Sequence, residues 1–190
     1  ISRIAAVSTA LGSPNGEPAI VVNPDTFGEM DERAQRVVMA HEATHVLTGV
    51  VRKDVALWVA EGFADYVALH DDNEPLSVSA GQILRQVKAD GPPKRLPTSD
   101  DFDESTHGLS TIYESAWMAF RMLGEQHGDV AVRGFYTDVV AGADHLLTEL
   151  DVLPRGDTDG RIDPGMPLLS AWQGLLPPTD GFQPVEDVPA

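Results

Sequence analysis

The sequence predicts one α+β domain that is mostly helical, with a small N-terminal β-sheet. Apolar residues recur at helical spacing in most segments from residue 31 onwards, whereas the clearest strand pattern is the β-branched run at 19–23. A chain of 190 residues with 42% hydrophobic content is long enough to bury one core. We expect one domain over residues 1–176, followed by a Pro-rich tail at 177–190.

The amino-acid composition excludes several classes of partner and of functional site. The net charge is −17, with 30 acidic against 13 basic residues, which argues against a nucleic-acid partner or an anionic membrane surface. The absence of cysteine excludes disulfides, cysteine nucleophiles and thiolate metal sites, so any metal would bind His, Asp or Glu. No apolar run approaches about 20 residues, so we expect no membrane insertion in this segment.

The sequence does not determine the oligomeric state or the location of the protein. The oligomeric state has no signature in the sequence. Because the chain begins with Ile1 rather than Met, we expect a processed or excised domain, and its location is unknown. An extracellular or cell-envelope site is compatible with such processing.

The N-terminal segment contains the sheet. Residues 1–12 are mildly apolar and fit a strand or a short helix, and a turn cluster follows at 13–18. The run 19–23 is a strand that ends before Pro24. A strand in this place could border a cleft and pair with an extended peptide, or it could be an ordinary core strand. Both interpretations remain open.

The next segment predicts a helix that begins after Asp31 as N-cap and ends at Gly49. His41 and His45 are one turn apart on the same face, so both imidazoles can reach one tetrahedral metal at about 2.0–2.1 Å. Glu42 projects beside them, where a general base can contact a metal-bound water. The alternative is two ordinary helix histidines beside a solvated glutamate.

A second helix is expected at 55–70, with Asp54 as its N-cap. If this helix returns antiparallel to the first, Glu61 comes to lie beside the histidines. It would then supply a third protein ligand and leave a fourth position for water. Asp65, one turn further, can accept the free N–H of a ligand histidine. The alternative for Glu61 is a solvent-facing acid, although its neighbours are mostly apolar.

Two stretches together resemble a known family. His41-Glu42-Ala43-Thr44-His45, followed by Trp58-Val59-Ala60-Glu61-Gly62-Phe63-Ala64-Asp65-Tyr66, is similar to the gluzincin metallopeptidases, and most of all to the peptidase MA-like group. The resemblance covers about residues 19–70 and continues more loosely to about 176. It implies a Zn²⁺ ion at His41, His45 and Glu61, with Glu42 as base and proton shuttle. It also implies that Asp65 supports a ligand histidine.

The same resemblance implies a zincin-like domain whose cleft lies between the sheet edge and the zinc helix. Its reaction would be hydrolysis of a peptide or protein substrate by a zinc-activated water, with endopeptidase action as the default. A catalytically inactive zinc-binding or partner-binding module that retains the scaffold is the alternative. A structural protein with accidental motifs would hold no metal.

Further helices are expected downstream. One runs over 79–89, a rigid Pro-rich loop follows at 91–97, and residues 98–103 form an acidic loop. The next helix opens at Thr111, whose pairing with Glu114 fits a capping box, and stops at Gly128.

Tyr113 falls near the start of that helix. In the resembling family, a tyrosine at this place lies near the metal, where its phenol can donate to an oxyanion. The alternative is a tyrosine packed on the core, and His107 is a second candidate for the same duty.

Four C-terminal segments complete the prediction. Asp129 caps a helix to about 140, and a shorter helix follows at 144–150. The acidic insert 155–165 resembles a calcium loop only faintly, so an acidic turn is the preferred interpretation and its role is open. A last packing helix is expected at 168–176.

Overall fold

The computed structural model describes residues 4–13, 15–103 and 105–142. The expectations for 144–150, 155–165, 168–176 and the tail at 177–190 lie outside the described residues, as does the proposed domain boundary at 176.

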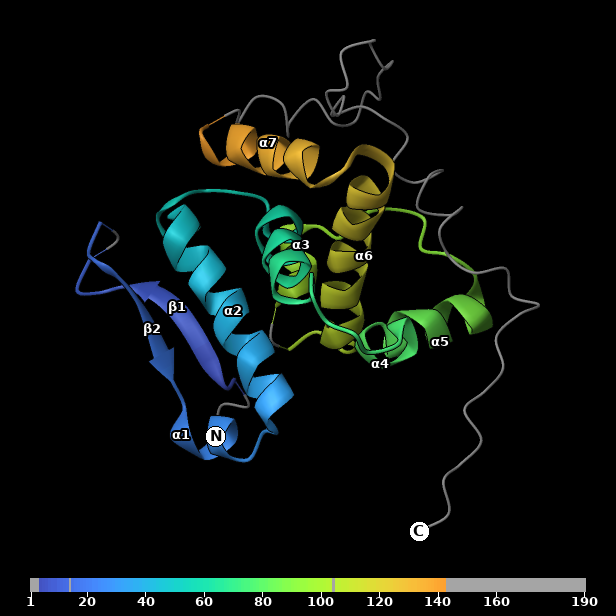
Figure 1. The fold of residues 1–190 in the computed structure, drawn as a ribbon, viewed down its shortest axis with the longest axis horizontal. Coiled ribbons are helices and arrows are strands. Elements are labelled where there is room, and N and C mark those ends of the chain that lie inside the picture. Colours follow the sequence, from blue (N-terminus) through green and yellow to red (C-terminus); the bar gives the residue numbers. More distant parts are fainter. Residues whose placement is uncertain (1–3, 14, 104, 143–190) are drawn as a thin grey trace.

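The described chain is mostly helical and carries one two-stranded antiparallel sheet, as the α+β class predicts. The sheet lies beside helix α2, and α3 packs between α2 and α6 (Figure 1). Helix α7 covers one end of this layer, and α4 and α5 extend from the other. The elements are β1 (Ala6–Ala10), β2 (Pro18–Val22), α1 (Pro24–Gly28), α2 (Glu32–Thr48), η1 (Val50–Arg52), α3 (Leu57–Ala68), α4 (Leu76–Ser79), α5 (Gly81–Asp90), η2 (Ser99–Phe102), α6 (Leu109–His127) and α7 (Asp129–Val140).

The strand predicted at 19–23 is confirmed as β2, and residues 1–12 contain its partner β1. Val7 pairs with Val21, so the two strands share a register that places Pro18 opposite Ala10. The Asn23 backbone N–H donates to the Ala5 carbonyl oxygen, so these two residues form a hydrogen-bonded pair. Hydrogen-bonded and non-hydrogen-bonded pairs alternate along the two strands, which makes Pro18 and Ala10 a non-hydrogen-bonded pair. The backbone nitrogen of Pro18, which carries no hydrogen, therefore faces the outer edge of the sheet, where no hydrogen bond between the strands is lost.

Helix α2 begins and ends where its caps predict. The Asp31 carboxylate accepts from the Ala34 backbone N–H at 2.7 Å, and Gly49 closes the helix with φ of 70°. A left-handed residue in this position favours glycine, because a Cβ would be strained there.

Three predicted caps are wrong. Asp54 does not cap α3, which begins at Leu57 after Ala56 with no side-chain cap. Helix α6 begins at Leu109, so Thr111 lies inside it and forms no capping box. Asp129 is the first residue of α7 rather than its cap, and its carboxylate accepts from the Tyr66 hydroxyl at 2.6 Å.

The Glu114 carboxylate caps a different helix from its own. Its Oε2 accepts from the backbone N–H groups of Gln82 and Ile83 at 2.8 and 2.7 Å, in the first turn of α5. These N–H groups have no partner within their own helix, so a distant side chain satisfies them.

Short helical turns were missed by the sequence patterns. Helix α1 follows Asn23, which caps it, and begins with Pro24. The helix expected at 79–89 is confirmed as α5, Gly81–Asp90, but the short helix α4 that precedes it was not expected. The acidic segment 98–103 contains η2, with a capping box formed by Thr98.

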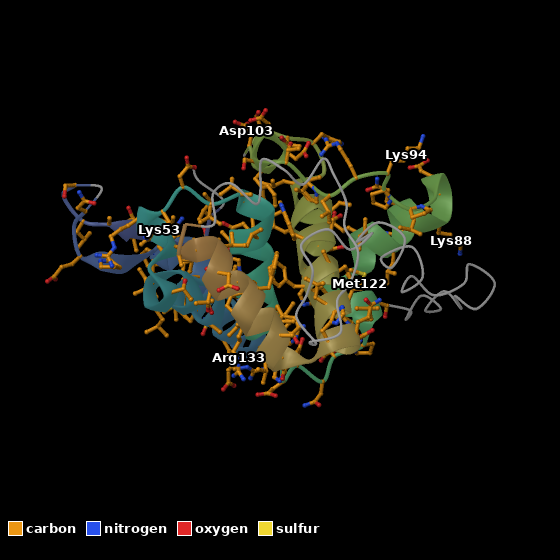
Figure 2. All side chains as sticks on the ribbon, turned by 90° about the horizontal axis from the view of Figure 1, so that it is seen from above. Lys53, Lys88, Lys94, Asp103, Met122 and Arg133 are labelled. Carbon is orange, nitrogen blue, oxygen red and sulfur yellow. The ribbon has the colours of Figure 1, made fainter. Side chains whose placement is uncertain are left out.

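The core lies where α3 crosses α6. Its largest fully buried side chains are Phe120, Ile83, Met118, Met122, Leu123, Val59 and Val132. Figure 2 shows Met122 within the helical layer, whereas Lys88, Lys94 and Arg133 lie at its periphery. No helix among the described residues has both the length and the apolar character that a membrane span requires.

Candidate metal centre

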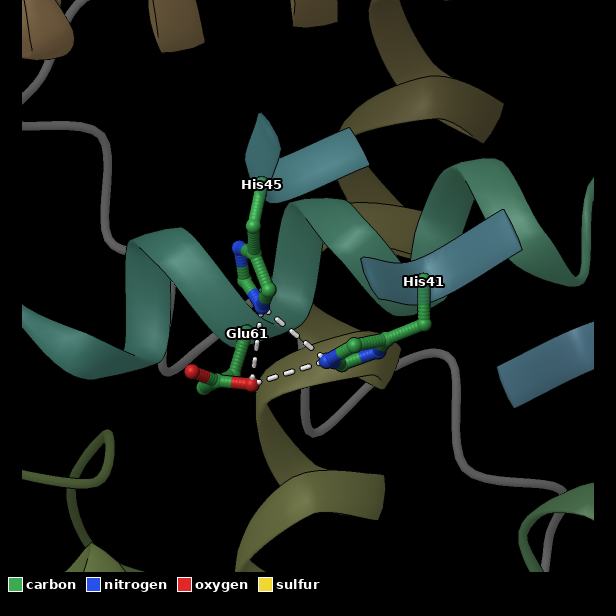
Figure 3. Close-up of side chains that lie close together, drawn as sticks. All are labelled: His41, His45 and Glu61. Carbon is green, nitrogen blue, oxygen red and sulfur yellow. Dashed lines mark hydrogen bonds and ion pairs between the residues drawn. The ribbon is translucent and has the colours of Figure 1, made fainter. Parts of the chain in front are cut away.

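Two helices bring the candidate ligands together. Arg33, at the start of α2, donates to Asp72, which follows the end of α3, so the two helices run in opposite directions. This is the antiparallel return under which the sequence predicts that Glu61, sixteen positions after His45, lies beside the histidines. As a result His41 and His45, from α2, face Glu61, from α3 (Figure 3).

The three ligand atoms form a close triangle. The Oε2 atom of Glu61 lies 3.0 Å from His41 Nε2 and 3.3 Å from His45 Nε2. The two Nε2 atoms are 3.1 Å apart. Among residues 4–13, 15–103 and 105–142, this is the only group of three or more His, Cys, Asp or Glu side chains arranged to hold a metal ion.

The triangle matches the donor spacing of a tetrahedral ion. Bonds of about 2.0–2.1 Å at tetrahedral angles separate neighbouring donors by about 3.3 Å. Two imidazole nitrogens and one carboxylate oxygen are donors that zinc accepts. Two neutral imidazole lone pairs 3.1 Å apart would repel each other unless a proton or a cation lies between them. The residues therefore fit a zinc ion.

Asp65 fixes the orientation of His41. Its Oδ1 lies 2.7 Å from His41 Nδ1, so Nδ1 donates and the Nε2 lone pair of the neutral ring points at the triangle. In the absence of a metal, burial alone would lower the pKa of His41. The hydrogen bonds to Asp65 and Glu61 outweigh burial and raise that pKa from 6.5 to about 10.

Glu61 is held as the carboxylate. Burial alone would raise its pKa, but the hydrogen bonds to His41 and His45 lower it from 4.5 to about 2. His45 differs from His41 in its support, because its buried Nδ1 has no hydrogen-bond partner among the described residues. The carboxylate of Glu61 therefore provides the main polar contact of the His45 ring besides His41.

The Glu42 carboxylate has no polar partner among the described side chains. Only 9% of the residue is exposed, and the carboxylate forms no hydrogen bond or ion pair with the described residues. Its oxygens are not among the fully buried atoms that lack a partner, so water can reach them. A general base that takes a proton from water needs this access.

Tyr113 lies beside the ligands rather than among them. Its ring centre is 6.5 Å from that of His41 and 5.1 Å from that of Phe102, which contacts it edge-on. Of the residues named from the sequence, His41, His45 and Glu61 thus form the triangle, and Asp65 and Tyr113 lie beside it.

No family model, curated protein or solved structure matches this chain.

Several residues that support the site were not found from the sequence. Thr48 Oγ1 and the Tyr136 hydroxyl are 3.0 Å apart, which ties α7 to the end of the ligand helix. Tyr136 also stacks on Phe63, at 3.8 Å between ring centres. Both contacts join residues more than 70 positions apart, and no local pattern marks them.

Gly62 follows Glu61 and allows α3 to lie close to α6. A Cβ at Gly62 would meet the Ala116 carbonyl oxygen at 2.6 Å. The glycine after the ligand is visible in the sequence, but the need for it arises from the crossing of α3 and α6.

Proposed function

We propose that this chain is a zinc-dependent metallopeptidase of the gluzincin type. The observation that carries the proposal is the triangle of His41 Nε2, His45 Nε2 and Glu61 Oε2, with separations of 3.0–3.3 Å. Three protein ligands leave a fourth position for water, which is the arrangement of catalytic rather than structural zinc sites.

A zincin-like architecture is part of this proposal. The sheet that precedes α2 packs against it through β1, and Ser8 of β1 lines a small cavity of about 160 Å³ together with His45 and Glu61. By the ladder alternation, Ser8 directs its backbone N–H and C=O away from β2. This free edge is available to an extended peptide, which supports the first of the two interpretations of the N-terminal sheet.

The reaction we propose is hydrolysis of a peptide bond. A zinc ion, when bound, would polarise the scissile carbonyl and lower the pKa of a coordinated water. Glu42 accepts a proton from the attacking water on its carboxylate and donates it to the leaving amine nitrogen. The water oxygen forms the new bond to the carbonyl carbon, and the C–N bond breaks. We propose endopeptidase action, because the sequence contains no Gly-Ala-Met-Glu-Asn-type motif for binding the terminal amine of a substrate.

The supporting roles follow from contacts. Asp65 holds His41 with its Nε2 lone pair directed at the triangle. Tyr113, near the His41 ring, is the candidate donor to the oxyanion that forms during attack.

The test compares the zinc-loaded wild type with Glu42→Gln on a mixed peptide library. The variant should retain zinc by elemental analysis and lose about 10²–10⁴-fold in kcat/KM, because the proton acceptor is removed while the ligands remain. Glu29→Gln is the control, because it makes the same change at an exposed site and should keep wild-type turnover.

Three results would count against the proposal. Equal turnover by Glu42→Gln and the wild type would show that Glu42 is not the general base. No turnover by a zinc-loaded wild type would favour the inactive binding module. A protein that takes up no zinc would favour a structural role.

A further inference from the structure

A second cavity, of about 360 Å³, lies on the Asp65 side of the candidate centre. Its volume falls within the range of about 300–1,000 Å³ that is common for small-ligand sites. Asp65 and Tyr113 form part of its wall, and the same Asp65 accepts from His41 Nδ1 at 2.7 Å. Asp65 therefore contacts both the cavity and His41, whose other ring nitrogen is a corner of the ligand triangle.

The described residues that line the cavity include two carboxylates and no basic side chain. Asp65 and Glu114 both line the cavity, and no Lys, Arg or His is among the described residues that do so. Each carboxylate uses one oxygen in hydrogen bonds: Asp65 accepts from His41, and Glu114 accepts from the α5 backbone. Their second oxygens have no hydrogen-bond partner among the described residues.

The charge of Glu114 is poorly compensated. Burial raises the pKa of its carboxyl group, and the charge of Asp65 raises it further, against the lowering by the α5 N–H groups and Arg85. A cation that enters the cavity would stabilise the ionised form.

The rest of the lining suits an aliphatic chain. Leu69, Leu109 and Trp117 supply apolar surface, and Ser110 adds a hydroxyl at the exposed start of α6. A lysine or arginine side chain matches this lining, because it combines an apolar stem with a charged end.

We propose that this cavity receives the basic side chain of a substrate residue next to the bond that is cleaved. The proposal rests on the proposed peptidase function and names its substrate class as peptides with lysine or arginine beside the scissile bond. The net charge of −17 favours the same class, because it attracts basic peptides at long range.

The experiment uses internally quenched peptides that carry lysine, norleucine or glutamate at each position flanking the cleaved bond. The zinc-loaded wild type should prefer lysine over norleucine by about tenfold or more in kcat/KM at one of these positions, as expected for one well-placed charge pair. Glutamate at that position should be the poorest substrate.

Two variants link the preference to the cavity. Glu114→Gln keeps an oxygen for the α5 N–H groups but removes the charge, so the preference for lysine should fall about fivefold or more. Ser110→Lys places a cation at an exposed lining residue of the cavity, outside α5, and should also reduce or reverse the preference. Glu29→Gln changes the net charge equally at an exposed site and should leave the preference unchanged.

Binding to Glu42→Gln separates this proposal from the proposed reaction. The inactive variant should still bind the lysine peptide more tightly than the norleucine peptide, and adding Glu114→Gln should remove the difference. Cleavage without a lysine preference, or a preference that survives both cavity variants, would overturn the cavity assignment and leave the peptidase. Selective binding without any cleavage by the wild type would overturn the peptidase and support the cavity.

Discussion

The Nδ1 atom of His41 lies 2.7 Å from the Oδ1 atom of Asp65, and this contact fixes which nitrogen of the ring faces the ligand triangle. Replacing Asp65 by Asn should lower zinc affinity about 10–100-fold, because the amide is a weaker partner for the ring N–H. Competition with a chromophoric chelator measures this change. Asp71→Asn, at a fully exposed neighbouring acid, is the control. Equal zinc affinity in the two variants would show that Asp65 does not support the ligand.

The metal-free protein should keep a proton on His41 at neutral pH. Its pKa in the folded state, about 10, exceeds the ordinary 6.5, so the stabilisation is complete below pH 6.5 and is lost as pH rises through about 10. Chemical denaturation of metal-free protein between pH 6 and 10.5 should show this loss. A flat profile over that range would contradict the prediction.

Zinc binding should displace the same proton. Titration calorimetry at pH 7 in two buffers with different ionisation enthalpies should report the release of about one proton per zinc. Proton release that vanishes already at pH 8 would mean that the His41 pKa is close to its ordinary value.

Gly62 provides a test of the α3–α6 crossing. Gly62→Ala should destabilise the fold by about 1–3 kcal/mol, because the new Cβ meets backbone of Ala116 that cannot move aside cheaply. The control is Gly134→Ala in α7, where no atom lies within 4 Å and the substitution should stabilise by about 0.4–1 kcal/mol. Urea denaturation measures both. Similar effects at the two glycines would show that α3 does not need the close approach.

Arg33 and Asp72 join the start of α2 to the end of α3. Arg33 Nε donates to Asp72 Oδ1 at 3.1 Å, and the second nitrogen, Nη2, contacts Asp72 Oδ2 and Ser79. The hydrogen bonds from Arg33 lower the pKa of Asp72 below its ordinary 3.8. The contribution to stability is therefore present above pH 3.8 and is lost as pH falls through the folded-state pKa.

The matching variant is Asp72→Asn, which should cost about 1–3 kcal/mol at pH 7 by weakening charged hydrogen bonds. The difference from wild type should shrink as pH falls below 3.8. Denaturation curves at pH 7, 4 and 3 measure it, and a difference that stays constant would show that the ion pair does not contribute through charge.

Local patterns predicted the ligand helices well and the caps unevenly. Asp31 and Gly49 act within their own helix, so their positions in the sequence were sufficient to place α2. Thr111 and Glu114 have the spacing of a capping box, but their helix begins at Leu109, and Glu114 instead satisfies the N–H groups of α5, more than 30 residues away. This partner depends on the packing of α5 against α6, which no local pattern shows.

The residues of the candidate site also divide into those that local sequence patterns predict and those that depend on how the helices pack. His41, His45 and Glu61 could be predicted because helical periodicity and one short connection determine their approach. Tyr136 could not, because its contacts with Thr48 and Phe63 depend on how α7 crosses the other helices. The cavity beside Asp65 was likewise invisible, since α3, α4 and α6 each contribute to it.

The order of the elements has a consequence for biosynthesis. The donor side chains all belong to α2 and α3, whereas α6, which buries the apolar face of α3, is made later. During translation the amino-terminal half leaves the ribosome first and lacks the frame that sets the spacing of the donors. On the proposed function, loading of the ion is therefore a late step in maturation, after the carboxy-terminal helices have closed over the first two.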